Sequence, residues 1–302
     1  MKISVIIPTL NAAPVIVSLL NGILNQTVKP DEIIVVDSES NDETVLLSQA
    51  YPLTRIIAIK RADFDHGGTR DMAFHASIGD VVLFFSQDVI IRDDCYIETL
   101  VQAALHEGVA CAFGRQIARK DAPLYEKYTR AFNYPEQSNL RSANDIPRLG
   151  IKAFFFSDVC SAYRRDAYLA VGGFDYPVPT NEDMLIAAKF LHAGYQIAYC
   201  AEAVVVHSHN YSLRQEFERN YKIGFVIRKY QRLLDCGSAN TDGVRYVRFV
   251  LRKLLSGVAL LQCFKFCLLC VAKFCGFKLG ESAAPKNGDE FFDKAYRSGR
   301  ND

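Results

Sequence analysis

Short apolar runs recur through the first 115 residues, and each is followed by a segment with the apolar spacing of a helix. The runs are rich in Val, Ile and Phe, which favours strands. The opening segment MKISVIIPTLN is interpreted as a first strand rather than a targeting signal, because Pro8 interrupts its short apolar run. Strands are predicted at residues 3–7, 32–36, 55–60, 80–85 and 109–113, and helices at 13–24, 41–50, 69–77 and 96–107.

The predicted strands are continuously apolar and do not alternate with polar residues, which is typical of strands covered on both faces. Repeated strand–helix units predict an α/β fold with a doubly wound, mostly parallel sheet and helices on both faces. A weaker pattern at 120–150 predicts a helix and a loop. Further strands are expected at 154–156, 160–163 and 196–206, a helix at 180–193, and helices beyond residue 209.

Composition limits the class of protein without naming it. The chain has 302 residues, of which 50% are apolar and 23% charged, as in a globular protein of one large or two small domains. The net charge of +1 gives no reason to expect a nucleic-acid partner. Nine cysteines, an odd number, do not suggest a disulfide framework, so a reducing compartment is expected.

Polar, charged and glycine residues gather where the predicted strands end. Ligands of open parallel sheets bind beyond the carboxyl ends of the strands, so this convergence predicts a binding site. The strand ends carry Pro8, Thr9 and Asn11, then Asp37 and Ser38, then Arg61, His66, Gly67 and Arg70, and finally Ser86, Gln87 and Asp88.

Several common sites of α/β proteins are excluded by missing motifs. No GxGxxG follows the first strand, which argues against a dinucleotide site. The chain also lacks the GxxxxGK[ST] of phosphate-binding loops and the GxSxG of α/β-hydrolases.

One family matches the ordered set of motifs. The segments VIIPTLN, IIVVDSESNDET, SQD, GGFD and NED resemble those of family 2 glycosyltransferases, and FDHGGTRD resembles the rhamnosyltransferase-like branch. The resemblance covers residues 3–211 and implies a GT-A fold, a nucleotide-sugar donor, a divalent cation and inversion at the anomeric carbon. We therefore expect a catalytic domain at 1–211, with a nucleotide-binding half to about 115 and an acceptor half at about 116–211.

The resemblance also implies roles for the strand-end residues. Thr9 and Asp37 are expected to contact the base and ribose of the donor, with Pro8, Asn11, Ser38, Arg61 and Gln87 nearby. In FDHGGTRD, the paired glycines allow positive φ and close backbone approach, and Thr69 is expected to cap the next helix. Arg70 is expected to pair with the diphosphate, with His66 and Gly67 beside it. A plain strand-to-helix turn is the alternative.

A metal site is expected at Asp88. Ser86-Gln87-Asp88 occupies the place of the family's DxD motif, and Ser86 replaces the first acid, which leaves Asp88 as the main ligand. His207 and His209 follow a predicted strand, where alternate side chains point the same way, and either could complete the shell. The cation is Mg²⁺ or Mn²⁺, and a histidine ligand favours Mn²⁺. The alternatives are a helix cap for Asp88 and structural roles for the histidines.

A general base is expected in Asn181-Glu182-Asp183, which matches the family's acidic pair on the acceptor side. An inverting displacement needs a base to take the acceptor's hydroxyl proton. Asp183 is the first choice and Glu182 the second. Thr180-x-x-Asp183 also fits a capping box, and the two roles are compatible.

The C-terminal part is basic and apolar. Between 222 and 278, eleven basic residues face only two acids, and Lys265 and Lys273 interrupt the apolar stretch. We therefore expect residues 212–280 to form amphipathic helices on an anionic membrane rather than a spanning helix, with a polar tail at 281–302. Packing on the catalytic domain, an oligomer interface such as a homodimer, and a shallow re-entrant or true membrane span are the alternatives.

The expected function is a metal-dependent inverting transfer of a sugar, with rhamnose favoured, from a dTDP- or UDP-sugar such as dTDP-rhamnose. The expected acceptor is lipid-diphosphate-linked saccharide or polysaccharide in cell-surface glycan synthesis, and the expected place is the cytoplasmic side of a bacterial inner membrane, peripherally bound. One alternative is a nucleotidyltransferase, whose glycine-rich first loop is absent. The other is a non-catalytic membrane-associated scaffold.

Overall fold

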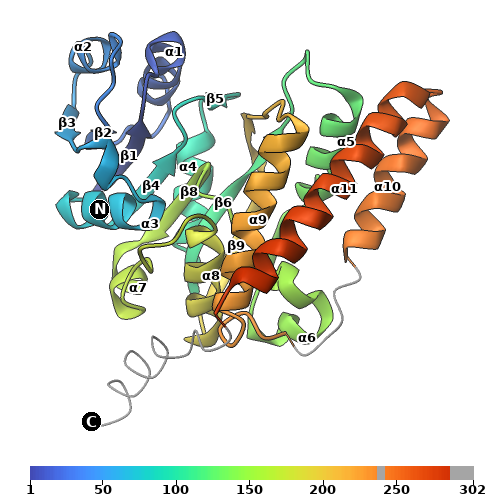
Figure 1. Ribbon diagram of the computed structural model, residues 1–302. Helices are drawn as coiled ribbons and strands as arrows, with labels where there is room; N and C mark the ends of the chain where they lie inside the picture. The colour runs from blue at the N-terminus through green and yellow to red at the C-terminus, as the bar shows by residue number, and fades with distance from the viewer. Residues whose placement is uncertain (237–241, 286–302) are drawn as a thin grey trace.

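The computed structural model describes residues 1–236 and 242–285 of the chain, and a single mixed sheet runs through it (Figure 1). The strand order is β3-β2-β1-β4-β8-β6-β9-β5, and β7 pairs with β9. The strands are β1 (Ile3–Thr9), β2 (Glu32–Asp37), β3 (Thr54–Ala58), β4 (Val81–Phe85), β5 (Ile90–Ile91), β6 (Val109–Ile117), β7 (Asn139–Arg141), β8 (Cys160–Arg164) and β9 (Gln196–Val206).

Helices cover both faces of this sheet and continue into a helical C-terminal region (Figure 1). They are α1 (Ala13–Leu24), α2 (Thr44–Gln49), α3 (His66–Ala76), α4 (Tyr96–Ala104), α5 (Leu124–Asn133), α6 (Ile146–Leu149), α7 (Arg165–Ala170), α8 (Glu182–His192), α9 (Leu213–Lys229), α10 (Asp242–Ser256) and α11 (Leu260–Ala283). Short 3-10 turns lie at Arg61–Asp63, Ala143–Asp145 and Gly150–Phe154.

The sheet is mostly parallel in its first half and mixed in its second. β3, β2, β1 and β4 run parallel, whereas β8 is antiparallel to both β4 and β6. β6 and β9 are parallel, and the short strands β5 and β7 pair antiparallel with β9. The predicted α/β class and doubly wound arrangement are confirmed.

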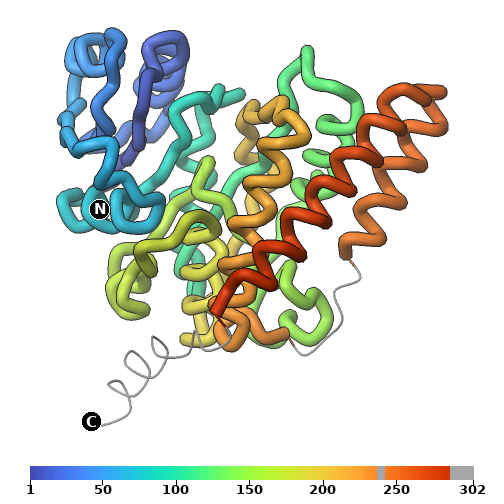
Figure 2. Tube along the Cα trace, viewed as in Figure 1, coloured from blue at the N-terminus to red at the C-terminus, as the bar shows by residue number. Residues whose placement is uncertain are grey.

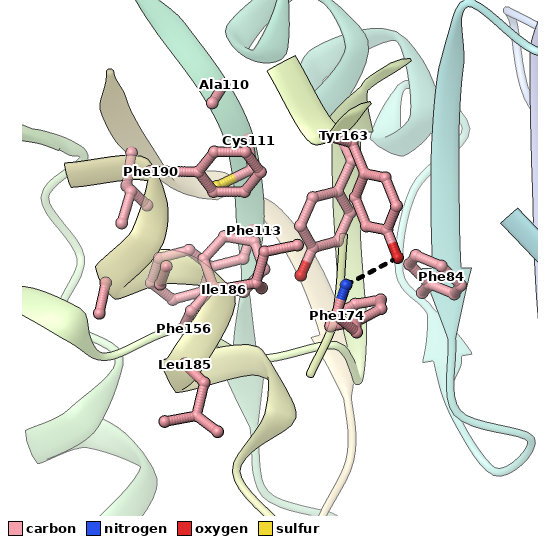
Figure 3. Close-up of a cluster of buried hydrophobic side chains, with 14 of the residues drawn as sticks. Phe84, Ala110, Cys111, Phe113, Phe156, Tyr163, Phe174, Leu185, Ile186 and Phe190 are labelled. Atoms are coloured by element: carbon pink, nitrogen blue, oxygen red, sulfur yellow. Dashed lines mark hydrogen bonds between the residues drawn. The ribbon is translucent and has the colours of Figure 1, made fainter. Parts of the chain in front are cut away.

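Two hydrophobic cores, one on each face, explain the continuously apolar strands. Along β4, Val82 and Phe84 pack into one core, and Val81, Leu83 and Phe85 pack into the other. The first core is rich in aromatic rings, some of which are drawn in Figure 3. Burial on both faces removes the need for polar residues in alternate positions.

Two predicted strands differ from the structure. β1 continues through Pro8 to Thr9. Pro8 has no N–H to donate, but β4 pairs with β1 only as far as Ile6, so no hydrogen bond to β4 is lost at Pro8. The run 154–156 is not a strand: a 3-10 turn ends at Phe154, and the apolar side chains fill the core from a loop. A short apolar run cannot be assigned to a strand by periodicity alone.

The C-terminal helices α9 and α11 lie side by side, as Figure 2 shows. Three glycines allow their backbones to touch: a Cβ on Gly224 would overlap the carbonyl of Phe277, one on Gly276 that of Phe217, and one on Gly280 that of Tyr221. α11 continues to Ala283, slightly beyond the predicted limit at 280. Most of the expected polar tail lies outside the described residues.

Candidate active site

A cavity of about 330 Å³ opens where α3, α5 and α9 meet the ends of β1, β4, β6 and β9. Eight of the residues named from the sequence line it, namely Pro8, His66, Arg70, Ser86, Gln87, Asp88, His207 and His209. Its other walls come from residues that the sequence analysis did not single out, including Gln116, Arg130, Tyr134, Ser157, Tyr211 and Arg219.

Asp88, His207 and His209 form one cluster in this cavity. One potential ligand atom from each lies within 4.8 Å of the others, and His207 Nε2 is 3.5 Å from Asp88 Oδ1. The two imidazole rings are 4.5 Å apart, centroid to centroid. Asp88 bonds to Arg119 (3.4 Å), and α4 begins only at Tyr96, so the helix-cap alternative for Asp88 is wrong.

Gln116 fixes the orientation of the His207 ring. Its Oε1 lies 3.0 Å from His207 Nδ1 and also accepts from Arg130, while its Nε2 donates to Ser157 Oγ at 2.8 Å. An oxygen that only accepts places the proton on Nδ1 and leaves the Nε2 lone pair facing Asp88. Burial, together with the positive charge of Arg130, lowers the pKa of His207 to about 2, so the ring is neutral.

The cluster fits a divalent cation on chemical grounds. A neutral imidazole with its second nitrogen held by a hydrogen bond is the usual form of a metal-ligating histidine. One carboxylate and two imidazoles suit Mn²⁺ better than Mg²⁺, which prefers oxygen ligands. Asp88 and the two histidines would hold such an ion.

The expected base- and ribose-binding residues form a separate hydrogen-bonded group at the ends of β1 and β2. Asp37 accepts from Thr9 Oγ1 (3.2 Å) and from the amide and hydroxyl of Ser40. Asn11 accepts from the amide of Asn41. The buried hydroxyl of Ser38 has no hydrogen-bond partner, which suits a polar ligand beside it.

Gln87 links this group to the cavity, because its side-chain amide bonds both the N–H and the carbonyl of Leu10 (2.8 and 3.2 Å). Arg61 lies in the 3-10 turn with an exposed side chain, and its backbone N–H donates to Glu39. The residues that line the cavity do not include Thr9, Asn11, Asp37, Ser38 or Arg61.

The FDHGGTRD segment folds differently from the expectation in two respects. Asp65, not Thr69, caps α3, since its Oδ1 accepts from the amide of Gly68 at 2.8 Å. Helix α3 therefore starts three residues early, and neither glycine adopts positive φ. The expected close approach is confirmed, because a Cβ on Gly67 would overlap the carbonyl of Asp175.

Arg70 lies between two buried carboxylates. Its NH1 donates to Glu182 Oε1 at 3.1 Å, and its Nε lies 3.9 Å from Asp158 Oδ2. Although burial opposes the charge, Glu182 and Asp158 raise the pKa of Arg70. Arg70 thus lines the cavity while its guanidinium is paired with two carboxylates of the protein. Its expected pairing with a diphosphate stays a prediction.

Asp183 accepts from the amides of Met184 (2.8 Å) and Asp158 (3.4 Å). Burial raises its pKa well above the usual value, and the nearby negative charges of Glu182 and Asp158 raise it further. The predicted capping box is wrong: Asn181 is the N-cap of α8, with φ of 64°, and makes no side-chain cap bond. Asp183 connects to the cavity wall through Asp158, the neighbour of Ser157.

Three cations in or beside the cavity could not be identified from the sequence. Arg119 follows β6, Arg130 lies on α5, and Arg219 lies on α9 with its guanidinium 5.7 Å from the ring centroid of Tyr211. A lone arginine in a helix carries no sequence signal of a site. Arg219 also shows that the basic C-terminal helices contribute a residue to the cavity.

Comparisons with known proteins point to one family. A model of the family "Glycosyl transferase family 2" matches residues 4–172. The O-antigen chain rhamnosyltransferase RfbN of Salmonella typhimurium is 41% identical over 289 residues, which are 93% of this chain and 90% of the relative. The O-antigen chain rhamnosyltransferase WbaN of Salmonella anatum is 38% identical, over 92% of this chain and 89% of the relative.

Solved structures share the fold at low sequence identity. The mannosyltransferase PcManGT of Pyrobaculum calidifontis, in complex with GDP-Man and Mn²⁺, has a TM-score of 0.61 at 17% identity, covering 96% of this chain and 88% of its own. Staphylococcus aureus TarS 1–349, in complex with UDP-GlcNAc, has a TM-score of 0.58 at 18% identity, with coverage of 84% and 72%. The fold, the site and the relatives together show that this chain is a glycosyltransferase and belongs to glycosyl transferase family 2.

Proposed function

We propose that this enzyme transfers a rhamnosyl residue from dTDP-rhamnose to a lipid-diphosphate-linked saccharide during O-antigen synthesis. The observation that carries the proposal is the similarity to two O-antigen chain rhamnosyltransferases over nearly the whole chain. The Asp88–His207–His209 cluster and the unpartnered Ser38 hydroxyl support a metal-dependent nucleotide-sugar site.

In this proposal, Asp183 removes the proton of the acceptor hydroxyl. Its raised pKa makes it a stronger base than an exposed aspartate, provided that the pH is high enough to leave it ionised. Glu182 is less suited to the role, because its carboxylate is already paired with Arg70. Arg70 and Asp158 act as positioning residues for this acidic group.

Asp88, His207 and His209 would hold the divalent cation, and the two imidazoles would favour Mn²⁺ over Mg²⁺. When bound, the cation neutralises the charge that develops on the leaving diphosphate. Arg130 and Arg219 line the same cavity, and Arg119, which pairs with Asp88, adds a third positive charge beside it.

The enzyme binds the cytoplasmic face of the inner membrane through α11. This helix is long and apolar enough to cross a membrane, and only 17% of its most apolar window is buried in the protein. Its buried side packs on α9, and its other side exposes Leu261, Phe264, Val271 and Phe274. Basic residues on α10 suit anionic headgroups at the edge of this apolar face.

The catalytic and membrane-binding roles belong to different parts of the chain. Residues 1–211 form the catalytic part, with the nucleotide held by the half before about residue 115 and the acceptor by the half after it. Residues 212–280 form the membrane-binding helices and also supply Arg219 to the cavity.

Donor hydrolysis tests the proposal directly. The full chain is incubated with a panel of nucleotide sugars, dTDP-rhamnose and UDP-sugars included, with Mn²⁺, with Mg²⁺ or with EDTA, and released nucleoside diphosphate is measured. We expect release from dTDP-rhamnose that requires the cation and is faster with Mn²⁺. Metal-dependent release from a different donor alone would replace rhamnose, and failure of any nucleotide to bind would reject the site.

A further inference from the structure

A second cavity, of about 320 Å³, adjoins the active site. The two share a wall at Tyr134, whose ring lines the first cavity and lies 5.5 Å from Phe155 and 6.4 Å from Tyr199, two residues that line the second. Helix α5 borders both, with Arg130 in the first and Phe132 in the second.

The second cavity is positively charged. Among the described residues that line it, Arg141, Arg148 and Lys152 are basic and none is acidic. Arg148 bonds to Asp145 outside the cavity, and Lys152 Nζ is 3.9 Å from Asp242, so the two cations at its rim are partly balanced. An anionic ligand would find at least one cation without a full counter-charge.

Arg141 is the cation built into the wall. Its side chain is buried, and its NH1 is fixed by the carbonyls of Lys152 (2.8 Å) and Ala153 (3.2 Å). Its NH2 is fully buried and has no hydrogen-bond partner. A buried charged donor without a partner is costly, which is the expected state of a donor that awaits a ligand. Burial lowers the pKa of Arg141 only to about 10, so it is charged at neutral pH.

The remaining lining is aromatic and apolar. Phe113, Phe132, Phe155 and Tyr199 contribute rings, with the Arg141 guanidinium 5.3 Å from the Phe113 ring centroid and Lys152 Nζ 4.1 Å from that of Phe132. A pocket with flat apolar walls and a few convergent cations suits a ligand that is anionic at one point and carries a sugar ring or hydrocarbon beside it.

The aromatic wall continues toward the C-terminal helices. The ring of Phe132 lies 5.5 Å from those of both Tyr246 and Phe249 on α10. Helix α10 in turn packs on α11, whose outer side is the exposed apolar face. The second cavity therefore lies between the active site and the helices proposed to bind the membrane.

We propose that the second cavity binds the phosphate groups of a glycosyl phosphate or diphosphate acceptor, with Arg141 and Lys152 as the main contacts. The acceptor sugar then extends past Tyr134 into the active site, and any lipid attached to the phosphate leaves along α10. This inference rests on the proposed glycosyl transfer and adds the acceptor's anionic site to it.

The test uses the full chain with three probes that share one hexose: a farnesyl-diphosphate-linked hexose, the hexosyl diphosphate without lipid, and the methyl glycoside. Lys152→Gln and Arg148→Gln are compared with Arg214→Gln, an exposed cation on α9 outside both cavities. Arg141→Lys is added because lysine keeps the positive charge but lacks the two parallel N–H donors of the guanidinium. Equilibrium binding without divalent cation is measured first, and then KM for acceptor and for donor.

We expect Lys152→Gln and Arg141→Lys to weaken binding of both phosphorylated probes about tenfold, the size of a lost charged hydrogen bond, and Arg148→Gln to weaken it less. The KM for donor should stay as in the wild type in every variant, and Arg214→Gln should bind the acceptor probes as the wild type does. Unchanged binding in the variants, or an equal loss for the methyl glycoside, would overturn the proposal.

The probes also separate the two sources of the phosphate. Tighter binding of the farnesyl compound identifies a lipid-linked acceptor, whereas equal binding identifies a free sugar phosphate, and either result supports the anionic site. The proposed function fails independently, since it is rejected by the absence of metal-dependent donor binding while the cation-free measurement still reports on the second cavity.

Discussion

The chemistry of Asp183 depends on the carboxylates around it, and its replacement separates catalysis from binding. Asp183→Asn keeps the shape and the contact with the amide of Met184 but cannot take a proton. We expect kcat to fall by about 10²- to 10⁴-fold, the usual contribution of a general base, with donor affinity nearly unchanged. Transfer rates and equilibrium donor binding measure the two effects. Loss of donor binding in this variant, or a greater loss of kcat in Glu182→Gln, would contradict the assignment.

The raised pKa of Asp183 predicts an unusual acid limb in the pH profile. A base works only when it is deprotonated, so kcat/KM should fall as the pH drops through a pKa well above the ordinary aspartate value. Asp158→Asn removes a neighbouring negative charge, which should lower the pKa of Asp183 and move the acid limb to lower pH. Asp166→Asn, on α7 and paired with Arg164, is the matched control. An acid limb that does not move in Asp158→Asn would rule out this coupling.

Gln116 is expected to act through His207 on cation affinity. Gln116→Leu removes the acceptor that holds the Nδ1 proton, so the Nε2 lone pair is no longer fixed toward Asp88. The affinity for Mn²⁺, measured by calorimetry in the presence of dTDP, should fall about ten- to hundredfold. Gln102→Leu, on the exposed side of α4, should leave it unchanged. An unaltered Mn²⁺ affinity in Gln116→Leu would mean that the histidine orientation is set elsewhere.

At this scale the sequence predicts the acids and histidines better than the cations. Asp88, His207 and His209 stand at strand ends, where an α/β fold is known to bind ligands, and the structure brings them together. Arg130 and Arg219 come from helices that reach the site only through tertiary packing, so no local pattern marks them. Asp158, the second carboxylate beside Arg70, lies in a loop and is not marked by any local pattern for the same reason.

At the scale of elements, the contact between α9 and α11 depends on glycine. Gly280→Ala places a methyl group against the backbone carbonyl of Tyr221, which cannot move away as a side chain end would. We expect a loss of about 1–3 kcal/mol in the free energy of unfolding, typical of overpacking. Gly243→Ala on α10 meets no atom and should leave stability equal or up to about 1 kcal/mol higher. Denaturant unfolding compares the two, and equal stabilities would contradict the close packing.

The elements themselves are largely predictable, and their boundaries follow local chemistry that the pattern hides. Apart from the two-residue strand β5, the order of strands and helices in the first half agrees with the prediction, because each longer element has one clear period. The pattern predicts the start of α3 three residues too late, since Asp65, four residues before the expected cap Thr69, caps a helix that begins at His66. The antiparallel direction of β8 could not be foreseen, because strand direction is set by connections and not by the strand's own residues.

At the scale of the whole molecule, the exposed face of α11 predicts membrane binding. Leu261→Glu combined with Phe264→Glu places two charges on side chains that are 82% and 64% exposed, so folding should be unaffected. Co-sedimentation with anionic vesicles should fall at least tenfold, because each lost apolar contact is worth about 1.5–3 kcal/mol. Leu46→Glu on α2, which is similarly exposed, is the control.

The same variant decides between the membrane and a second copy of the chain. Sedimentation velocity without lipid is measured for wild type and double variant. A dimer that dissociates in the variant, with vesicle binding unchanged, would assign the α11 face to a homodimer and contradict membrane binding. Binding to vesicles should also weaken as salt is raised, since the basic residues of α10 contribute through screened charge.

Helix α9 carries both Arg219, in the active-site cavity, and Gly224, in the backbone contact with α11. Among the described residues, the catalytic cavity and the apolar face are therefore joined by one helix, so a protein anchored through α11 would hold its active site at a constant height above the lipid. Such an enzyme would reach the terminal hydroxyl of a saccharide of one length only. A chain that had already grown by a few sugars would extend beyond the active site.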